Sequence, residues 1–208
     1  MDVDFVNVSA GVSRDAYFAL AEEARHERKP VAGEIPGTVT PWEALQARQS
    51  SFEHYVGFAS LFKEGYSDTL ALQFFAAAAE AGARVTPMLV ASKRTPETSA
   101  YQLTRLAKRT AVELLAGTDT GQSGTTVGET LHDELQELVS AGLTPAEALQ
   151  SATIAPARFL GWDQAMGTIE VRKVADLVML EANPLEDIRN TRKIAAVVVR
   201  GKVHRQSK

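Results

Sequence analysis

Three ionisable side chains follow short apolar segments in this sequence, and their types are those that bind metal ions or move protons. Glu34 ends the strand-like part of "KPVAGEIPG", His54 comes after "SSFE", and Asp119 stands in "LLAGTDTG". A short apolar run bounded by Pro or Gly is typical of a buried strand, and barrel enzymes hold their reactive groups at the carboxyl ends of parallel strands. One imidazole and two carboxylates form an oxygen and nitrogen ligand set that suits a divalent cation.

Each of these residues also has a simpler interpretation. Glu34 would be a solvated loop residue, and Asp119 would be a turn aspartate that bonds its own backbone, which the pattern alone favours slightly. His54 differs from the remaining histidines because a neutral imidazole at a strand end can bind a metal or act as an acid or base. We interpret the other histidines as solvated or structural: His26, His132 and His204.

Strand-like and helix-like segments alternate over most of the chain, which predicts a parallel sheet with covering helices. The expected strands are 4–10, 30–34, 50–55, 84–92 and 111–121. The expected helices are 13–28, 40–48, 67–83, 97–110 and 128–142. The start of the helix over 40–48 is the clearest, because Thr40, Pro41 and Glu43 supply an N-cap, a first-turn proline and a capping box.

The last part of the chain has a different character. The segment 144–161 begins with the same Thr-Pro-x-Glu pattern and is expected to form one further helix. Short strands with turns follow over 166–171, 175–182 and 194–205, the last resembling a hairpin that turns at Gly201. We therefore expect a domain boundary near residue 162.

Composition narrows the classes of function. The chain has 208 residues, a net charge of −4 and no cysteine, so disulfides and thiolate metal sites are excluded. A mildly acidic chain gives no sign of nucleic-acid binding. No apolar run reaches membrane-spanning length, and "MDVDFVNVSAG" lacks the pattern of a signal peptide. We therefore expect a cytoplasmic protein without a membrane or nucleic-acid partner.

At these motifs the sequence resembles the amidohydrolase superfamily of metal-dependent hydrolases, in particular its prolidase-like and imidazolonepropionase-like branch. The fourth, fifth, sixth and eighth barrel strands of that branch resemble, in this order, "DFVNVSAGVSRDAYFALAEEA", "VAGEIP", "SSFEH" and "LLAGTDTG". The tail from "LHDELQELVSAG" to "IAAVVVRGKVH" resembles the carboxyl-terminal region of the family almost throughout. The resemblance covers nearly the whole chain and is most specific in the tail.

This resemblance implies an α/β fold: a partial (β/α)8 TIM barrel of about five βα units over 1–161, and the remnant of a small β-sandwich over 162–208. It also implies one or two divalent metals, often zinc, whose bound water attacks an amide-type carbonyl of a small molecule such as a dipeptide. His54 matches the metal ligand of the sixth strand. Asp119 matches the eighth-strand aspartate, which is both a ligand and the proton acceptor.

The sequence departs from the family pattern in three places. The first-strand His-x-His pair would need a segment upstream of strand four, which these 208 residues do not contain. Asn7 replaces the fourth-strand lysine, which is usually carboxylated, and Glu34 replaces the fifth-strand histidine. We therefore expect an impaired site in which at most Glu34, His54 and Asp119 remain as ligands.

Two functions follow from this reading. The first is hydrolysis of an amide-type C–N bond by metal-activated water, with the activity impaired by the missing ligands. The alternative is a non-catalytic remnant or a binding or assembly module of the same fold, one version of which needs a separate amino-terminal half. Because an open parallel sheet has two unpaired edges, we also expect a homo-oligomer.

Overall fold

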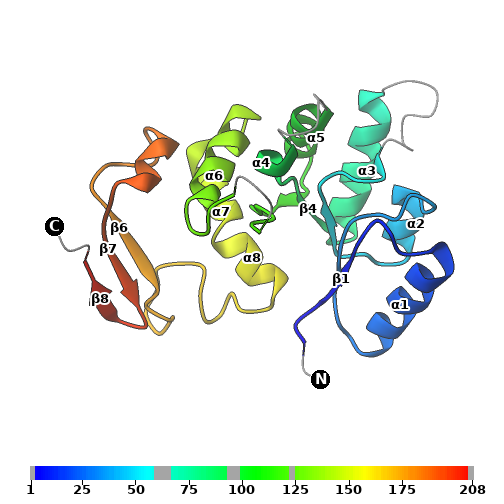
Figure 1. Ribbon diagram of the computed structural model, residues 1–208, viewed down its shortest axis with the longest axis horizontal. Helices are drawn as coiled ribbons and strands as arrows, with labels where there is room; N and C mark the ends of the chain where they lie inside the picture. The colour runs from blue at the N-terminus through cyan, green and yellow to red at the C-terminus, as the bar shows by residue number, and fades with distance from the viewer. Residues whose placement is uncertain (1–2, 59–66, 93–98, 122–124, 206–208) are drawn as a thin grey trace. The chain divides into compact units, whose positions relative to one another are not determined.

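The computed structural model describes residues 3–58, 67–92, 99–121 and 125–205. The chain divides into two compact units, Met1–Leu115 and Ala116–Lys208, which are described separately (Figure 1). No helix among the described residues is both long and apolar enough to cross a membrane. The sequence-based boundary near residue 162 is a different division and stays a prediction.

The first unit is built on five short parallel strands that follow one another in chain order. They are β1 (Val6–Val8), β2 (Val31–Gly33), β3 (Ser51–Glu53), β4 (Arg84–Thr86) and β5 (Glu113–Leu114). β1 pairs with β2, and β3, β4 and β5 pair in succession. A parallel bridge between Val31 and Gln49 connects the two groups. The α/β class is therefore confirmed, and within the described residues the strands form an open array rather than a closed barrel.

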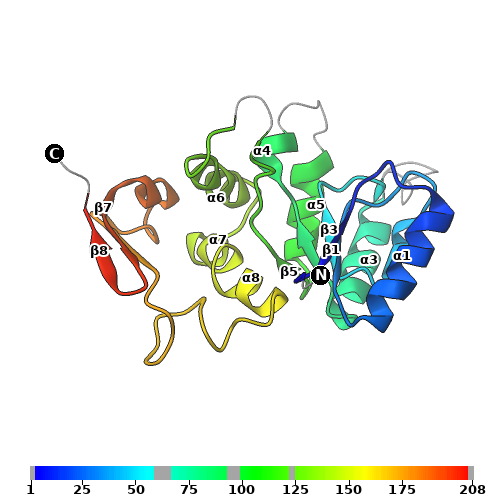
Figure 2. The same cartoon turned by 60° about the horizontal axis from the view of Figure 1, so that its bottom comes forward.

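The helices of this unit begin where the sequence supplies caps. They are α1 (Arg14–His26), α2 (Pro41–Gln46), α3 (Asp68–Glu80), α4 (Leu89–Ser92) and α5 (Ser99–Lys108). Ser13 caps α1, and Thr40 forms the predicted capping box with Glu43 at the start of α2. α1 and α3 lie against the same side of the strands (Figure 2).

An aromatic cluster fills the space between β3 and its covering helix. The ring centroid of Phe52 on β3 lies 5.3 Å from that of Phe74 on α3, and the ring centroid of Phe58 lies 5.2 Å from that of Phe74. All three side chains are fully buried. Because side chains alternate across a strand, burying Phe52 under α3 turns its neighbours Ser51 and Glu53 toward the opposite face of the sheet.

A buried glutamine holds the junction between β2 and β3. The Gln49 amide nitrogen donates to the carbonyl oxygens of Gly33 and Ser51, each at 2.9 Å. Its side-chain oxygen accepts a 2.8 Å hydrogen bond from the Tyr17 hydroxyl of α1. Burial also raises the pKa of Tyr17, so this hydroxyl remains a donor. The network fixes both strands, and hence the residues that follow them, relative to α1.

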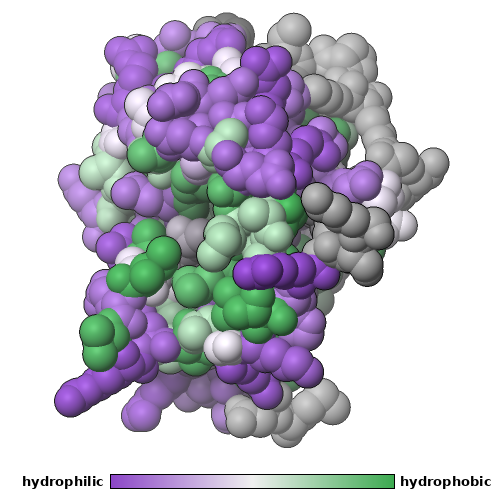
Figure 3. Space-filling model, turned by 90° about the vertical axis from the view of Figure 1, so that its left-hand side faces the viewer, coloured by the Kyte–Doolittle hydropathy of each residue, from purple (hydrophilic) through white to green (hydrophobic). Residues whose placement is uncertain are grey.

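The second unit combines three helices with a small antiparallel sheet. The helices are α6 (Thr130–Ser140), α7 (Pro145–Ser151) and α8 (Ile154–Phe159), with a 3-10 turn η2 (Ile188–Arg192). The sheet has the order β6 (Leu177–Leu180), β7 (Ile194–Val199) and β8 (Lys202–His204). The hairpin predicted at Gly201 is confirmed between β7 and β8. Apolar side chains are exposed on this part of the surface, including Val178 and Val203 (Figure 3).

Three sequence-based element predictions are wrong. The segment 84–92 is a strand only to Thr86, because Pro87 and a left-handed Met88 end it before α4 begins. The segment 144–161 forms two helices rather than one. Pro156 has no backbone N–H and fits only in the first turn of a helix, so the chain restarts as α8. The segment 166–171 pairs with no described strand, and Val171 remains 93% exposed.

Candidate active site

The two strand-end residues predicted in the first unit do follow their strands. Glu34 comes directly after β2, and His54 directly after β3. Because the strands are parallel, their carboxyl ends lie at the same edge of the array. Both side chains are half-buried, so each can be reached from solvent while part of it is fixed by the protein.

Glu34 connects two loops at this edge. Its carboxylate accepts a 2.7 Å hydrogen bond from the backbone N–H of Ala10, in the loop that follows β1. Its own backbone N–H donates to the Val8 carbonyl at 2.9 Å. Hydrogen bonds to an ionised carboxylate are shorter and stronger than neutral ones. One carboxylate oxygen of Glu34 therefore holds the β1–α1 loop, which the sequence alone did not indicate.

His54 occupies a strained turn. Its φ is 57°, and that of Tyr55 is 56°, a left-handed conformation that costs energy for residues other than glycine. The backbone N–H of His54 donates to the Thr86 carbonyl at 3.2 Å. The buried hydroxyl of Tyr55 shares a 2.9 Å hydrogen bond with the hydroxyl of Thr104. These contacts on both sides hold the turn in place. Strained residues held in this way are concentrated at functional sites.

A polar contact spans the array between β1 and β3. The Asn7 side-chain amide donates to the Glu53 carboxylate at 3.4 Å. Glu53 immediately precedes His54 and lies on the face of the sheet opposite the aromatic cluster. It therefore adds a carboxylate near the carboxyl end of β3, where His54 also lies. Sequence analysis did not select Glu53, although its position in "SSFEH" beside a candidate histidine was a usable signal.

Asp119 belongs to the second unit. It is half-buried and has a φ of 48°, so it too adopts a left-handed conformation. The hydroxyls of its neighbours Thr118 and Thr120 lie 2.6 Å apart, which closes a tight turn around it. The segment is attached to α7 by a 2.8 Å hydrogen bond from the Ala116 N–H to the Ser151 carbonyl. A turn role and a chemical role are both compatible with this geometry.

Comparison with known families places these features in context. The model of the Amidohydrolase family matches residues 9–204. The chain belongs to the amidohydrolase family. A comparison with curated proteins finds no match.

Solved structures show the same fold in other amidohydrolase-like proteins. A Xaa-Pro dipeptidase crystallised with methionine in its active site is similar with a TM-score of 0.76 and 21% identity, over 98% of this chain and 55% of the dipeptidase. The bottromycin amidohydrolase has a TM-score of 0.70 and 23% identity, over 97% of this chain and 56% of the amidohydrolase. Phenylurea hydrolase B has a TM-score of 0.73 and 19% identity, over 97% of this chain and 53% of the hydrolase. The chain thus spans about half the length of these structures.

The amidohydrolase ligand set predicted from the sequence is distributed over the two units. Glu34 and His54 lie in the first unit and Asp119 in the second, so their assembly into one site stays a prediction. Within each unit, the described part of the chain contains no group of three or more His, Asp or Glu side chains spaced to hold a metal ion. The donor types fit a divalent cation, and Glu53 is a further carboxylate of the same kind.

Proposed function

We propose that this chain is an amidohydrolase-like protein that acts in the hydrolysis of an amide-type C–N bond in a small molecule, such as a dipeptide. The match of the family model to residues 9–204 is the observation that carries the proposal. The strained backbone at both His54 and Asp119 supports it, because these are the two positions where the family resemblance expects reactive groups. The localisation that we propose is the cytoplasm.

The residues of the proposed site are His54, Asp119 and Glu34. We assign His54 as a metal ligand, Asp119 as ligand and proton acceptor, and Glu34 as a ligand through the carboxylate oxygen that does not hold Ala10. A bound divalent metal, with zinc the expected one, would supply Lewis acidity and a more acidic water. The chain's own contribution would be an imidazole, from His54, that holds the metal and a carboxylate, from Asp119, that accepts a proton.

The proposed activity is impaired relative to a complete amidohydrolase. Asn7 has no amine that could be carboxylated, and its side chain is engaged with Glu53. Glu34 adds a negative charge where the family resemblance expects a neutral imidazole, and part of its carboxylate is committed to a loop. The first departure removes a ligand, and the second replaces a neutral ligand with a charged one that is shared with a loop.

The alternative proposal is a non-catalytic binding or assembly module of the same fold, one version of which pairs with a separate amino-terminal half. The Glu34–Ala10 hydrogen bond favours this alternative, because it gives the carboxylate a structural role that needs no metal. Among the described residues of the first unit, β1 and β5 each pair with one strand only, which supports a homo-oligomer under either proposal.

Metal content of the purified protein distinguishes the two proposals. Elemental analysis after zinc loading and dialysis should give bound zinc that is lost in His54→Ala and in Asp119→Ala. His26→Ala is the matched control, because His26 is exposed and its ring lies 3.9 Å from the carboxylate of Glu23 on the same helix. Hydrolysis of an Xaa-Pro dipeptide is measured on the same samples. Protein that retains no zinc at saturating supply would contradict the enzyme proposal and favour the binding module.

A further inference from the structure

The turn that follows β3 contains two left-handed residues in succession. His54 has a φ of 57° and Tyr55 a φ of 56°. A strained conformation of this kind persists only where the surrounding structure fixes it. The backbone N–H of His54 donates to the Thr86 carbonyl of β4 at 3.2 Å, which fixes the start of the turn. The rest of the turn must be held through Tyr55 and the residues that it contacts.

The ring of Tyr55 is inserted among other aromatic side chains of the first unit, and only 7% of the residue is exposed. Its ring centroid lies 5.4 Å from that of Phe58 and 6.2 Å from that of Phe75 on α3. Both pairs have the edge-to-face arrangement that aromatic rings prefer. A phenylalanine would make the same apolar contacts. They therefore explain why the ring is buried, but not why it carries a hydroxyl.

The hydroxyl of Tyr55 takes part in a directed chain of hydrogen bonds. Thr104 of α5 is fully buried, and its hydroxyl donates to the Ala100 carbonyl at 2.8 Å. A hydroxyl has a single hydrogen, so toward Tyr55 the Thr104 oxygen accepts, and Tyr55 donates across 2.9 Å. The chain thus ends on the backbone of α5. Because apolar packing is non-directional, these hydrogen bonds are what give the buried ring a single orientation.

We propose that Tyr55, anchored by Thr104, is a positioning residue that fixes the imidazole of His54 for metal binding. The inference rests on the proposed function, which assigns His54 as a metal ligand. His54 and Tyr55 are adjacent in the same turn, so a Tyr55 ring that is held by α5 leaves the backbone of His54 little freedom. Groups that orient a ligand without binding the metal have a strong effect on metal affinity. α5 then contributes to the site, although none of the proposed ligands lies on it.

The test removes one hydroxyl at a time. In Tyr55→Phe and in Thr104→Val, the dissociation constant for zinc, measured by competition with a chromophoric chelator, should rise by about tenfold or more. Thr104→Ser keeps the hydroxyl and should bind zinc as the natural protein does. The matched control is Thr110→Val, because the Thr110 hydroxyl donates to the Ala107 carbonyl at 2.7 Å just beyond the end of the same helix. This control should leave the zinc affinity unchanged.

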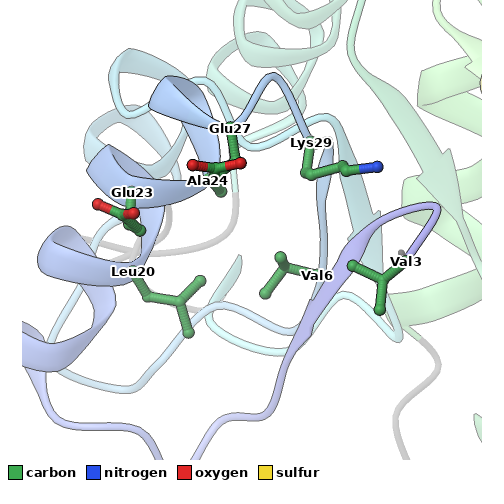
Figure 4. A pocket seen from close by; sticks show the side chains of 7 residues that line it. All are labelled: Val3, Val6, Leu20, Glu23, Ala24, Glu27 and Lys29. Atoms are coloured by element: carbon green, nitrogen blue, oxygen red, sulfur yellow. The ribbon is translucent and has the colours of Figure 1, made fainter. Parts of the chain in front are cut away.

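A second control separates positioning from a general loss of stability. Leu20 lines a hollow of about 310 Å³ between β1 and α1 (Figure 4). The lining residues Val6 and Lys29 begin β1 and precede β2, so the hollow lies at the amino ends of these strands. Glu34 and His54 follow the carboxyl ends of their strands instead. Leu20→Ala should therefore lower the melting temperature and leave the zinc affinity unchanged.

Nuclear magnetic resonance of the metal-free protein gives a readout that does not depend on metal binding. The ring signal of His54, assigned by its loss in His54→Gln, should shift in Tyr55→Phe and Thr104→Val while the signals of the other histidines stay in place. A His54 signal that neither variant shifts overturns the proposal. So does a zinc affinity that both variants retain, or one that Thr104→Ser lowers as much as Thr104→Val. A shifted His54 signal in protein that binds no zinc supports the positioning role and contradicts the metal site of the proposed function.

Discussion

Glu34 shows how one residue can meet a structural and a chemical demand at once. Its carboxylate is directed by the end of β2 toward the loop after β1, where it accepts the Ala10 N–H at 2.7 Å. A loop held in this way is stabilised whether or not a metal binds. The stability of the fold and the proposed metal site therefore depend on the same side chain and can be measured separately.

Replacing Glu34 with alanine should lower the free energy of unfolding by about 1 to 2 kcal/mol, because the half-buried Ala10 N–H loses its acceptor. Urea denaturation followed by circular dichroism measures this change. Glu22→Ala is the matched control, because Glu22 is exposed and its only described ion pair is a 3.8 Å contact with Arg25. The control should cost less than about 0.5 kcal/mol. Equal losses in the two variants would contradict the role given to Glu34.

At the scale of elements, Gln49 joins β2, β3 and α1 by three hydrogen bonds. Gln49→Leu should lower the free energy of unfolding by about 2 to 4 kcal/mol, because it leaves buried groups of Tyr17, Gly33 and Ser51 without partners. The exposed Gln164 allows the same substitution as a control, with little expected effect.

A double-mutant cycle tests the reason for this loss. Tyr17→Phe removes the hydroxyl that Gln49 accepts, so its effect combined with Gln49→Leu should be smaller than the sum of the two single effects. Strict additivity, measured by urea denaturation, would show that the two side chains act independently.

The contact of α6 with η2 contains a histidine that responds to pH. Thr191 donates its hydroxyl hydrogen to the Ile188 carbonyl at 2.8 Å, so toward His132 it accepts, and the 3.0 Å bond places the ring hydrogen on Nδ1. Burial of the ring and then the neighbouring Arg192 lower the pKa of His132, against the opposing effect of Asp133. The folded state therefore resists protonation of this ring.

The sign of the pH dependence follows from this lowered pKa. Below about pH 6.5, the ordinary pKa of histidine, the unfolded chain binds a proton at His132 that the folded chain takes up only at lower pH. Stability contributed by the neutral ring is thus present above that pH and is lost as the pH falls. Melting temperatures between neutral and mildly acidic pH should decline less steeply in His132→Gln than in the natural protein. Parallel declines would show that His132 is not the responsible group.

The sequence correctly predicted the starts of elements that are determined by a few neighbouring residues. Thr40 and Thr144 form capping boxes with glutamates three residues later, so the starts of α2 and α7 were predictable from a few adjacent residues. The strand ends at Glu34 and His54 followed from short apolar runs bounded by polar residues. The partners of the Glu34 side chain and of the His54 backbone were not predictable, because Ala10 and Thr86 approach them only through strand pairing. The contact of Glu53 with Asn7 was not predictable for the same reason, since it crosses from β3 to β1.

At the scale of the whole molecule, net charge and exposed apolar surface have opposite effects on association: charge keeps molecules apart, and apolar surface favours their contact. The chain has a net charge of −4 and an isoelectric point near 5.6, so its charge repulsion disappears at mildly acidic pH. Several aliphatic side chains of the second unit stay exposed, among them Val178, Val199 and Val203 of the small sheet (Figure 3). Without repulsion between molecules, such surfaces favour association.

Light scattering at fixed protein concentration should therefore rise to a maximum near pH 5.6 and fall again on the alkaline side. The loss of stability linked to His132 begins in the same pH range, so natural protein and His132→Gln must be compared. Scattering that follows charge alone will be the same in both, whereas scattering that follows unfolding will be reduced in His132→Gln. Val203→Lys should lower the maximum, because it adds charge to an exposed apolar position and also moves the isoelectric point upward. A maximum that keeps its height in Val203→Lys would show that the small sheet is not the associating surface.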